Sequence, residues 1–287
     1  MKELRKNFCV FIMSYGRADN VITLNLLKRF HYTGDWFIVC STDDPTLEDY
    51  RKRYDKHVLV FDKEDIAKRM DVADNLPGNK VIVYARNACF ELAQSLGYEY
   101  FLELDDDYKT FQWRYKNTGA LRGKDVMNYD HIFESMLEFL DASGALSVAF
   151  AQGGDLIGGL GGYKYQQKLV RKAMNTFFCT TKRPFKFLGK FNEDVNAYVL
   201  EAMRGGLFFT VMDACITQLP TQSNKGGMTE AYLDKGTYVK SFYSVICAPS
   251  AVYLSEMGSA HKRIHHHVRW NNCAPKILSD RWKKKQA

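Results

Sequence analysis

The 287-residue sequence lacks the features that mark several classes of protein. No apolar run approaches the roughly 20 residues of a membrane-spanning helix, so no membrane partner is expected. The basic start is followed by a short apolar run, Phe8 to Met13, without a small-residue cleavage pattern before Arg17, which argues against a secretory signal. The seven cysteines are odd in number and scattered through apolar runs, so they form neither a disulfide framework nor a zinc motif. These absences predict a protein of a reducing cytoplasm, and nothing indicates an obligatory protein partner.

Two common phosphate-binding loops are also missing. No G-x-G-x-x-G follows the first apolar run, which argues against a dinucleotide dehydrogenase. A glycine-dense stretch, residues 153–162, lacks the Gly-Lys-Ser/Thr ending of an ATPase P-loop. It is either a flexible loop that lets an acceptor approach or a plain surface loop. The 46% of hydrophobic residues is ample for a continuous core, in one large domain or two small ones, and excludes a disordered protein.

The net charge of +7 comes from two segments of the chain. Residues 261–287 hold eight Lys and Arg against one Asp, and between Asp155 and Glu193 there are eight bases and no acid. A solvated basic surface would explain either segment alone. Two separate segments on an otherwise acidic chain favour a polyanionic partner.

The N-terminal part alternates strand and helix signals. The pattern predicts strands at 8–13, 36–40, 57–61 and 100–104, helices at 19–30 and 80–96, and a short helix after Pro45. This rhythm indicates an α/β fold with a mostly parallel, Rossmann-like sheet and right-handed crossovers. Such sheets bind ligands beyond the carboxyl ends of their strands, so we expect the site just after Met13, Cys40 and Leu104.

Polar side chains follow each of these three strands. The first is followed by Ser14-Tyr15-Gly16-Arg17 and the second by Ser41-Thr42-Asp43-Asp44. An aromatic ring and an acid can hold a nucleoside, and an arginine can meet a phosphate, although ordinary turn chemistry also selects these residues.

Three consecutive carboxylates, Asp105, Asp106 and Asp107, follow the fourth strand. Like charges at the end of a buried strand repel one another and lose hydration unless a cation or a set of donors compensates. In an extended chain Asp105 and Asp107 project to one side and Asp106 to the other. Two carboxylates on one side suit Mg²⁺ or Mn²⁺ holding substrate phosphates, and a solvated acidic turn is the alternative.

An Asp-x-Asp triplet about a hundred residues into such a chain resembles the GT-A glycosyltransferases. The likeness spans Phe8 to Trp282 and is closest to the TET-associated glycosyltransferases, which include phage enzymes and relatives of the base J glucosyltransferase. Besides the triplet, the segments that carry it are Ser14-Tyr15-Gly16-Arg17, Ala85-Arg86-Asn87, Phe191-Asn192-Glu193-Asp194-Val195-Asn196, Arg263-Ile264-His265-His266-His267 and Arg269-Trp270-Asn271-Asn272.

The resemblance implies one GT-A domain over residues 1–287. Its nucleotide-sugar half would end at about 115, its acceptor half would span about 116–260, and the basic segment 261–287 would return to the metal. The implied activity is metal-dependent, inverting transfer from a UDP-sugar to a hydroxymethylated pyrimidine in DNA, in the host cytoplasm if a phage encodes the enzyme. A glycan or small-molecule acceptor is one alternative, and a noncatalytic DNA-binding module of the same fold is another.

The resemblance also assigns donor and metal roles. It places Ser14, Tyr15, Arg17 and Asp43 around the nucleotide, Arg86 near the diphosphate or sugar, and Asp105 with Asp107 at the metal (Mn²⁺ or Mg²⁺). Arg86 could equally counter the carboxylates or lie on a helix surface. On a strand His265 and His267 share a face, so either could ligate the metal, with the other as a phosphate donor, or the histidines could be structural. We take His265 as the candidate ligand.

An inverting transfer needs a carboxylate base to take the proton of the acceptor hydroxyl. The resemblance places it near Glu193 and Asp194, and we favour Asp194, which could instead cap the helix expected from Val195 to Met203. The candidate DNA contacts drawn from the two basic segments are Lys168, Arg171, Lys172, Arg263 and Arg269.

Overall fold

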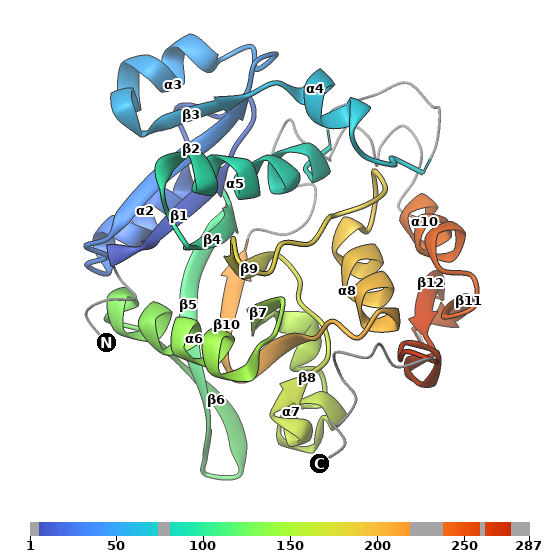
Figure 1. Ribbon diagram of the computed structural model, residues 1–287. Coiled ribbons are helices and arrows are strands. Elements are labelled where there is room, and N and C mark those ends of the chain that lie inside the picture. Colours follow the sequence, from blue (N-terminus) through green and yellow to red (C-terminus); the bar gives the residue numbers. More distant parts are fainter. Residues whose placement is uncertain (1–5, 74–80, 219–237, 259–261, 277–287) are drawn as a thin grey trace, which may run out of the picture.

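The computed structural model describes residues 6–73, 81–218, 238–258 and 262–276. Its centre is one ten-stranded sheet of order β3-β2-β1-β4-β9-β7-β10-β5-β6, with β8 paired to β10 (Figure 1). The strands are β1 Phe8–Met13, β2 Asp35–Ser41, β3 Val58–Phe61, β4 Tyr100–Asp105, β5 Tyr108–Asn117, β6 Ala120–Asp125, β7 Ser147–Ala151, β8 Leu169–Val170, β9 Thr176–Thr180 and β10 Phe208–Gln218. A separate two-stranded hairpin joins β11 (Val252–Met257) to β12 (Arg263–Val268).

Strands β3, β2, β1 and β4 run parallel, as the N-terminal pattern predicts. Beyond β4 the sheet is mixed, because β9 is antiparallel to both β4 and β7 while β10 is parallel to β7. The α/β fold class is therefore confirmed, with the four-strand parallel block at its N-terminal end. The sheet is continuous across the expected boundary near residue 115, which falls inside β5.

Helices cover both faces of the sheet. They are α2 Ile22–Arg29, α3 Leu47–Tyr54, α4 Lys63–Lys68, α5 Val83–Leu96, α6 Tyr129–Ser143, α7 Tyr163–Gln167, α8 Glu193–Met203 and α10 Val239–Cys247. Because side chains alternate along a strand, Phe8, Val10 and Ile12 of β1 join the core under α2 and α6, whereas the intervening Cys9, Phe11 and Met13 join the core under α5 and α8. Both faces of the parallel block are thus buried, which explains its continuous apolar runs.

The helices expected from the sequence form at nearly the expected places. Helix α2 begins three residues later than the predicted Asp19, and α5 ends at Leu96 because Gly97 adopts a left-handed conformation with φ of 80°. Among the described helices, none has the length and apolar character needed to cross a membrane. All seven cysteines are free, and six of them are buried, in agreement with the absence of a disulfide framework.

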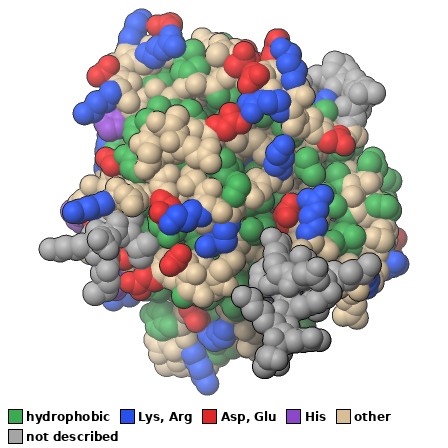
Figure 2. Space-filling view, in the orientation of Figure 1, with side chains coloured by type: hydrophobic (Ala, Val, Ile, Leu, Met, Phe, Trp, Pro, Cys, Tyr) green, Lys and Arg blue, Asp and Glu red, His purple; other side chains and the backbone are tan. Residues whose placement is uncertain are grey.

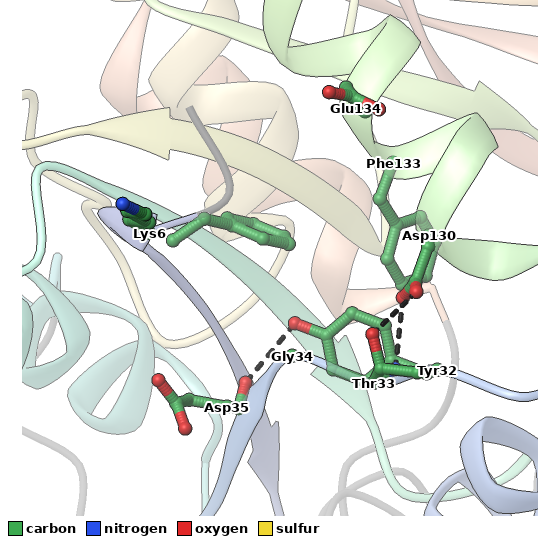
Figure 3. A pocket seen from close by; sticks show the side chains of 9 residues that line it. Lys6, Tyr32, Thr33, Gly34, Asp35, Asp130, Phe133 and Glu134 are labelled. Carbon is green, nitrogen blue, oxygen red and sulfur yellow. Dashed lines mark hydrogen bonds between the residues drawn. The ribbon is translucent and has the colours of Figure 1, made fainter. Parts of the chain in front are cut away.

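A cavity of about 240 Å³ lies at the amino ends of β1 and β2 (Figure 3). Phe8, Tyr32 and Phe133 line it, and at its rim Asp130 accepts hydrogen bonds from the backbone N–H and hydroxyl of Thr33. This is the edge of the sheet opposite the carboxyl ends of β1, β2 and β4. The cavity is therefore separate from the polar residues that the sequence singles out.

Candidate functional site

The Asp triplet is fixed to the start of α2. Asp105 is the last residue of β4, and Asp106 and Asp107 form the link to β5. The Thr23 hydroxyl donates to the Asp105 carbonyl oxygen at 2.6 Å and accepts from the Tyr108 N–H at 3.0 Å, and the Thr23 N–H donates to the Asp106 carbonyl oxygen at 3.1 Å. Three hydrogen bonds to one threonine of α2 therefore connect this turn to the helix.

Asp106 has different partners from Asp105, which bonds to Arg86. Its Oδ1 accepts from Arg17 Nη1 at 2.6 Å and its Oδ2 from the Ser14 hydroxyl at 2.5 Å, while the Ser14 Oγ also lies 2.6 Å from the Tyr50 hydroxyl. The structure thus shows Ser14 and Arg17 bonded to Asp106. Through Asp106 the loop after β1 is joined to the loop after β4.

Asp105 and Asp107 are only partly buried, and both hold their protons more tightly than usual. Burial raises the pKa of Asp105 to about 7, helped by Asp107 and Asp106 and opposed by Arg86. Burial, together with Asp106, raises the pKa of Asp107 to about 6. Neighbouring carboxylates that raise each other's pKa are the kind of donor that a hard divalent cation would stabilise. The described residues contain no ready-made group of three or more His, Cys, Asp or Glu that could hold a metal, so His265 is not gathered with this pair.

Arg86 of α5 joins the triplet to the start of α8. Its guanidinium donates to Glu103 at 3.3 Å, to Asp105 at 3.2 Å and to Glu193 at 3.2 Å, and it lies over the Phe177 ring at 4.9 Å. The residue is 1% exposed, so it is not a helix-surface arginine, and of the expected roles the geometry shows the one that counters carboxylates. One cation among three carboxylates leaves excess negative charge. Accordingly, burial raises the pKa of Glu103 to about 8, although Arg86 opposes that shift.

Glu193 and Asp194 open α8 and are both buried. The expected alternative of Asp194 as the N-cap is wrong, because the helix begins at Glu193 and Asn192 is the cap, with φ of 51°. Glu193 is bound to Arg86, whereas Asp194 accepts a hydrogen bond from the Val195 N–H at 2.7 Å. Burial raises the pKa of Asp194 to about 7, and Glu193 adds to this effect, while the Val195 N–H, Arg86 and Lys172 oppose it. Asp194 is therefore the carboxylate of this pair that Arg86 does not bind.

The loops after β1, β2 and β3 form a second polar group. Lys63, at the start of α4, donates to Asp43 Oδ2 at 2.8 Å and lies 4.8 Å from the centre of the Tyr15 ring, and the Tyr15 hydroxyl donates to the Asp43 carbonyl at 3.3 Å. Burial alone would raise the pKa of Asp43, but hydrogen bonds from Lys63 and Ser41 lower it. Lys63 was not among the residues expected from the sequence. It follows β3 almost directly, so the rule that found Tyr15 and Asp43 would have found Lys63 at the third strand.

The histidine run lies on β12, beside the start of α8. The Asn192 amide nitrogen is 3.1 Å from His266 Nδ1. Burial and the cations Lys240 and Arg263 lower the pKa of His265 to about 4, and burial with His265 and Lys240 lowers that of His266 to about 3. Both imidazoles are therefore neutral at pH 7, and they lie on the Asp194 side of the site.

Four of the eight bases between Asp155 and Glu193, which we call the first basic segment, form ion pairs in the folded chain. Lys164 and Lys172 both pair with Asp155, Lys168 pairs with Asp213 at 2.6 Å, and Lys182 pairs with Glu99 at 2.6 Å. On the face shown in Figure 2, Lys and Arg side chains likewise alternate with Asp and Glu instead of forming one basic patch. The sequence could not reveal this, because each acidic partner lies outside the segment.

The candidate DNA contacts consequently differ from one another. The prediction for Lys172 is wrong, since this residue is buried and its ammonium is bound to Asp155. Lys168 and Arg171 are exposed, although Lys168 pairs with Asp213 and Arg171 donates to the Cys273 carbonyl at 3.0 Å. Arg263 and Arg269 are exposed. Four further bases of the C-terminal segment, Arg281 and Lys283 to Lys285, lie outside the described residues.

Acidic side chains at the carboxyl ends of parallel strands, beside an aromatic and acidic loop, define an α/β site of the kind that binds nucleotides and their phosphates. Residues 8–227 match the model of the TET-Associated Glycosyltransferase family, and the chain therefore belongs to this family of glycosyltransferases.

Two solved structures resemble the fold at low sequence identity. A mycobacterial protein is 10% identical, with a TM-score of 0.45, and the match covers 93% of this chain and 86% of that one. Residues 1–349 of S. aureus TarS are 13% identical, with a TM-score of 0.39, and the match covers 73% of this chain and 59% of that one. No curated protein gives a significant match.

Proposed function

We propose that the protein transfers a sugar, with inversion, from a UDP-sugar to the hydroxymethyl group of a modified pyrimidine in DNA, with a divalent metal at Asp105 and Asp107. The observation that carries the proposal is the bridge from Asp105 through Arg86 to Glu193. The Arg86 guanidinium bonds both to Asp105, a candidate ligand of the donor metal, and to Glu193, the first residue of α8. Donor and acceptor chemistry can therefore occur within one site.

The donor would bind across the carboxyl ends of β1, β2 and β4. Tyr15, Lys63 and Asp43 offer a ring, an ammonium and a carboxylate to the nucleoside, and Asp105 and Asp107 would hold Mn²⁺ or Mg²⁺. Bound there, the metal would neutralise the diphosphate as it leaves. Ser14 and Arg17 would act through Asp106, by fixing the loop that carries Tyr15 against the metal turn. A Mn²⁺ titration of His265→Ala decides whether His265 joins the ligands, because a lost ligand weakens the response to metal.

Asp194 would be the general base. The oxygen of the acceptor hydroxymethyl group attacks the anomeric carbon, the bond from that carbon to the diphosphate oxygen breaks, and the hydroxyl proton passes to Asp194. A carboxylate with a pKa near 7 combines a large ionised fraction with useful basicity at neutral pH. Glu193, held by Arg86, would keep the first turn of α8 in place.

The test is a mass shift on DNA. Duplexes containing hydroxymethylcytosine or hydroxymethyluracil would be incubated with Mn²⁺ and a panel of nucleotide sugars, beside an unmodified duplex of the same sequence. A shift equal to one sugar residue, seen only on the hydroxymethylated duplex and abolished by Asp107→Asn, supports the proposal. Sugar transfer to a glycan or small molecule, with none to DNA, would replace the acceptor. DNA binding without turnover of any nucleotide sugar would indicate a noncatalytic module.

A further inference from the structure

The β11–β12 hairpin presents two different faces. On the inner face Val252 is opposite Val268 and Leu254 is opposite His266. Val252 is buried in the core under α5 and α8, and His266 contacts Asn192, the residue that precedes α8. Just past β12, Trp270 stacks on Tyr198 of α8, with ring centres 5.8 Å apart. The inner face therefore fixes the hairpin to the helix that carries Asp194.

The outer face carries a row of two arginines and two histidines, which we call the basic row after its arginines. Arg263, His265 and His267 alternate along β12, and Arg269 continues the spacing one residue beyond the strand. Alternate residues of a strand lie about 7 Å apart on one face. Tyr253 of β11 is opposite His267, with ring centres 5.7 Å apart, and the Arg269 guanidinium lies 4.5 Å from the Tyr253 ring centre. The result is a surface with two guanidinium groups and two aromatic rings, on which Tyr253 is 37% exposed.

This face carries no opposing acid within the described hairpin. The β11 residues that face the basic row are Tyr253, Ser255 and Met257, whereas Glu256 is on the other face and pairs with Lys262 at 3.0 Å. Arg263 and Arg269 form no ion pair with any described residue. This distinguishes them from four lysines of the first basic segment, which form ion pairs with Asp155, Asp213 and Glu99.

We propose that the outer face of the β11–β12 hairpin is the platform for the acceptor DNA strand, with Arg263 and Arg269 on phosphates and with Tyr253 and His267 stacked on bases that flank the target. A nucleotide strand is the partner that offers anionic groups and planar rings in alternation. The carboxylates of an acidic peptide could pair with the arginines, but such a peptide would offer the rings no stacking partners.

The inference rests on the proposed DNA acceptor and adds the place where the strand binds. The hairpin lies beyond residue 227, where the family match ends, so the match does not account for this surface. A target base must leave the stack to reach a buried site, and flanking bases are then free to stack on protein rings. The hairpin packs by its inner face on α8, the helix that carries Asp194, and the platform is the opposite face of the same hairpin.

The test is fluorescence anisotropy with a fluorescein-labelled oligonucleotide, single-stranded and duplex, over a salt series. Tyr253→Ala should weaken binding of the single strand about 10-fold, and Tyr253→Phe should retain wild-type affinity, because stacking needs only the ring. Arg263→Gln with Arg269→Gln should reduce the slope of log affinity against log salt by about 1.4 on a single strand, which corresponds to two phosphate contacts. The melting temperature of each variant establishes that it is folded.

A second hairpin provides the matched control. Tyr115 of β5 is 41% exposed and faces the exposed Arg122 of β6, on the ribbon that projects at the foot of Figure 1. Tyr115→Ala with Arg122→Gln should leave both the affinity and the salt slope at wild-type values. Equal losses in this control and in the β11–β12 variants would refute a localised platform.

Failure of the platform and failure of the proposed DNA acceptor give different results. If the wild type binds DNA but Tyr253→Ala and the double arginine variant bind it equally well, the platform is wrong and the DNA acceptor stands. If Tyr253→Phe is as weak as Tyr253→Ala, stacking is refuted. A wild type that ignores DNA at low salt while still hydrolysing a nucleotide sugar overturns the DNA acceptor, and the platform with it.

Discussion

Replacing Asp194 by Asn should have opposite effects on turnover and on stability. Asn keeps the shape of Asp and can still accept the hydrogen bond from the Val195 N–H, but it can take no proton from the acceptor. Turnover should fall by about 10² to 10⁴, with donor affinity little changed, because the proton moves only in the transition state. In the wild type, turnover should rise as the pH increases through about 7, where Asp194 becomes ionised beside Glu193, Arg86 and Lys172.

The stability effect follows from the same pKa. The folded protein binds the Asp194 proton more tightly than the unfolded chain does, so the stability contributed by this group is greatest below pH 3.8 and decreases until the pH passes about 7. A change from 3.8 to about 7 corresponds to at most about 4 kcal/mol of unfolding free energy, since each tenfold change in an ionisation constant is about 1.4 kcal/mol. Asn does not ionise, so the variant avoids the free-energy cost of ionising a buried carboxylate at high pH. Asp194→Asn should therefore be more stable than the wild type at pH 8, and the two should converge towards pH 4.

Urea unfolding of both proteins between pH 4 and pH 8 measures this difference. Glu193→Gln is the matched control and should behave in the opposite way, because it removes a charge that Arg86 stabilises. It should lower stability by about 1 to 3 kcal/mol at neutral pH. An Asp194→Asn protein that is less stable than the wild type at pH 8, or a difference that does not grow with pH, would refute the assignment of a buried, proton-accepting Asp194.

Three further substitutions test the rest of the site. Asp107→Asn should fold normally and lose at least about 100-fold in turnover, and chelation followed by Mn²⁺ should abolish and then restore wild-type activity, so a fully active variant removes the metal from this turn. Arg86→Met should cost about 3 to 5 kcal/mol in urea unfolding because it strands three carboxylates, and a loss below about 1 kcal/mol would mean that the buried bridge is unimportant. Lys63→Met should raise KM for the donor about 10-fold, as expected for a lost charged hydrogen bond, and an unchanged KM would leave Lys63 with a purely structural role.

The sequence was most informative where local pattern determines structure. The parallel block β1 to β4 could be located because strands buried on both faces leave apolar runs, and the rule on carboxyl ends then selected Tyr15, Asp43 and Asp105. The different partners of Asp105 and Asp106 also agree with simple alternation. These inferences need only neighbouring residues in the chain.

Properties that depend on distant partners could not be predicted. Lys172 looked like a free base because its acidic partner, Asp155, lies just outside the acid-free segment. The Arg86 bridge requires one strand, β4, and two helices, α5 and α8, to come together, and no spacing in the sequence indicates that they do. The antiparallel insertion of β9 between β4 and β7 is likewise a matter of topology, because strands of similar composition fit either direction.

The reactivity of the free cysteines can report local unfolding of the chain. Burial raises the pKa of thiols such as Cys9, Cys89 and Cys179, so in the native state they are protonated and out of reach of alkylating reagents. They are distributed over β1, α5 and β9, so each one becomes reactive only when its own part of the structure opens. Thiol labelling followed by peptide mapping would then rank these parts by how often they open, without any introduced probe. A donor nucleotide that binds at the carboxyl ends of the strands should slow labelling of Cys9 on β1 more than that of Cys215 on β10.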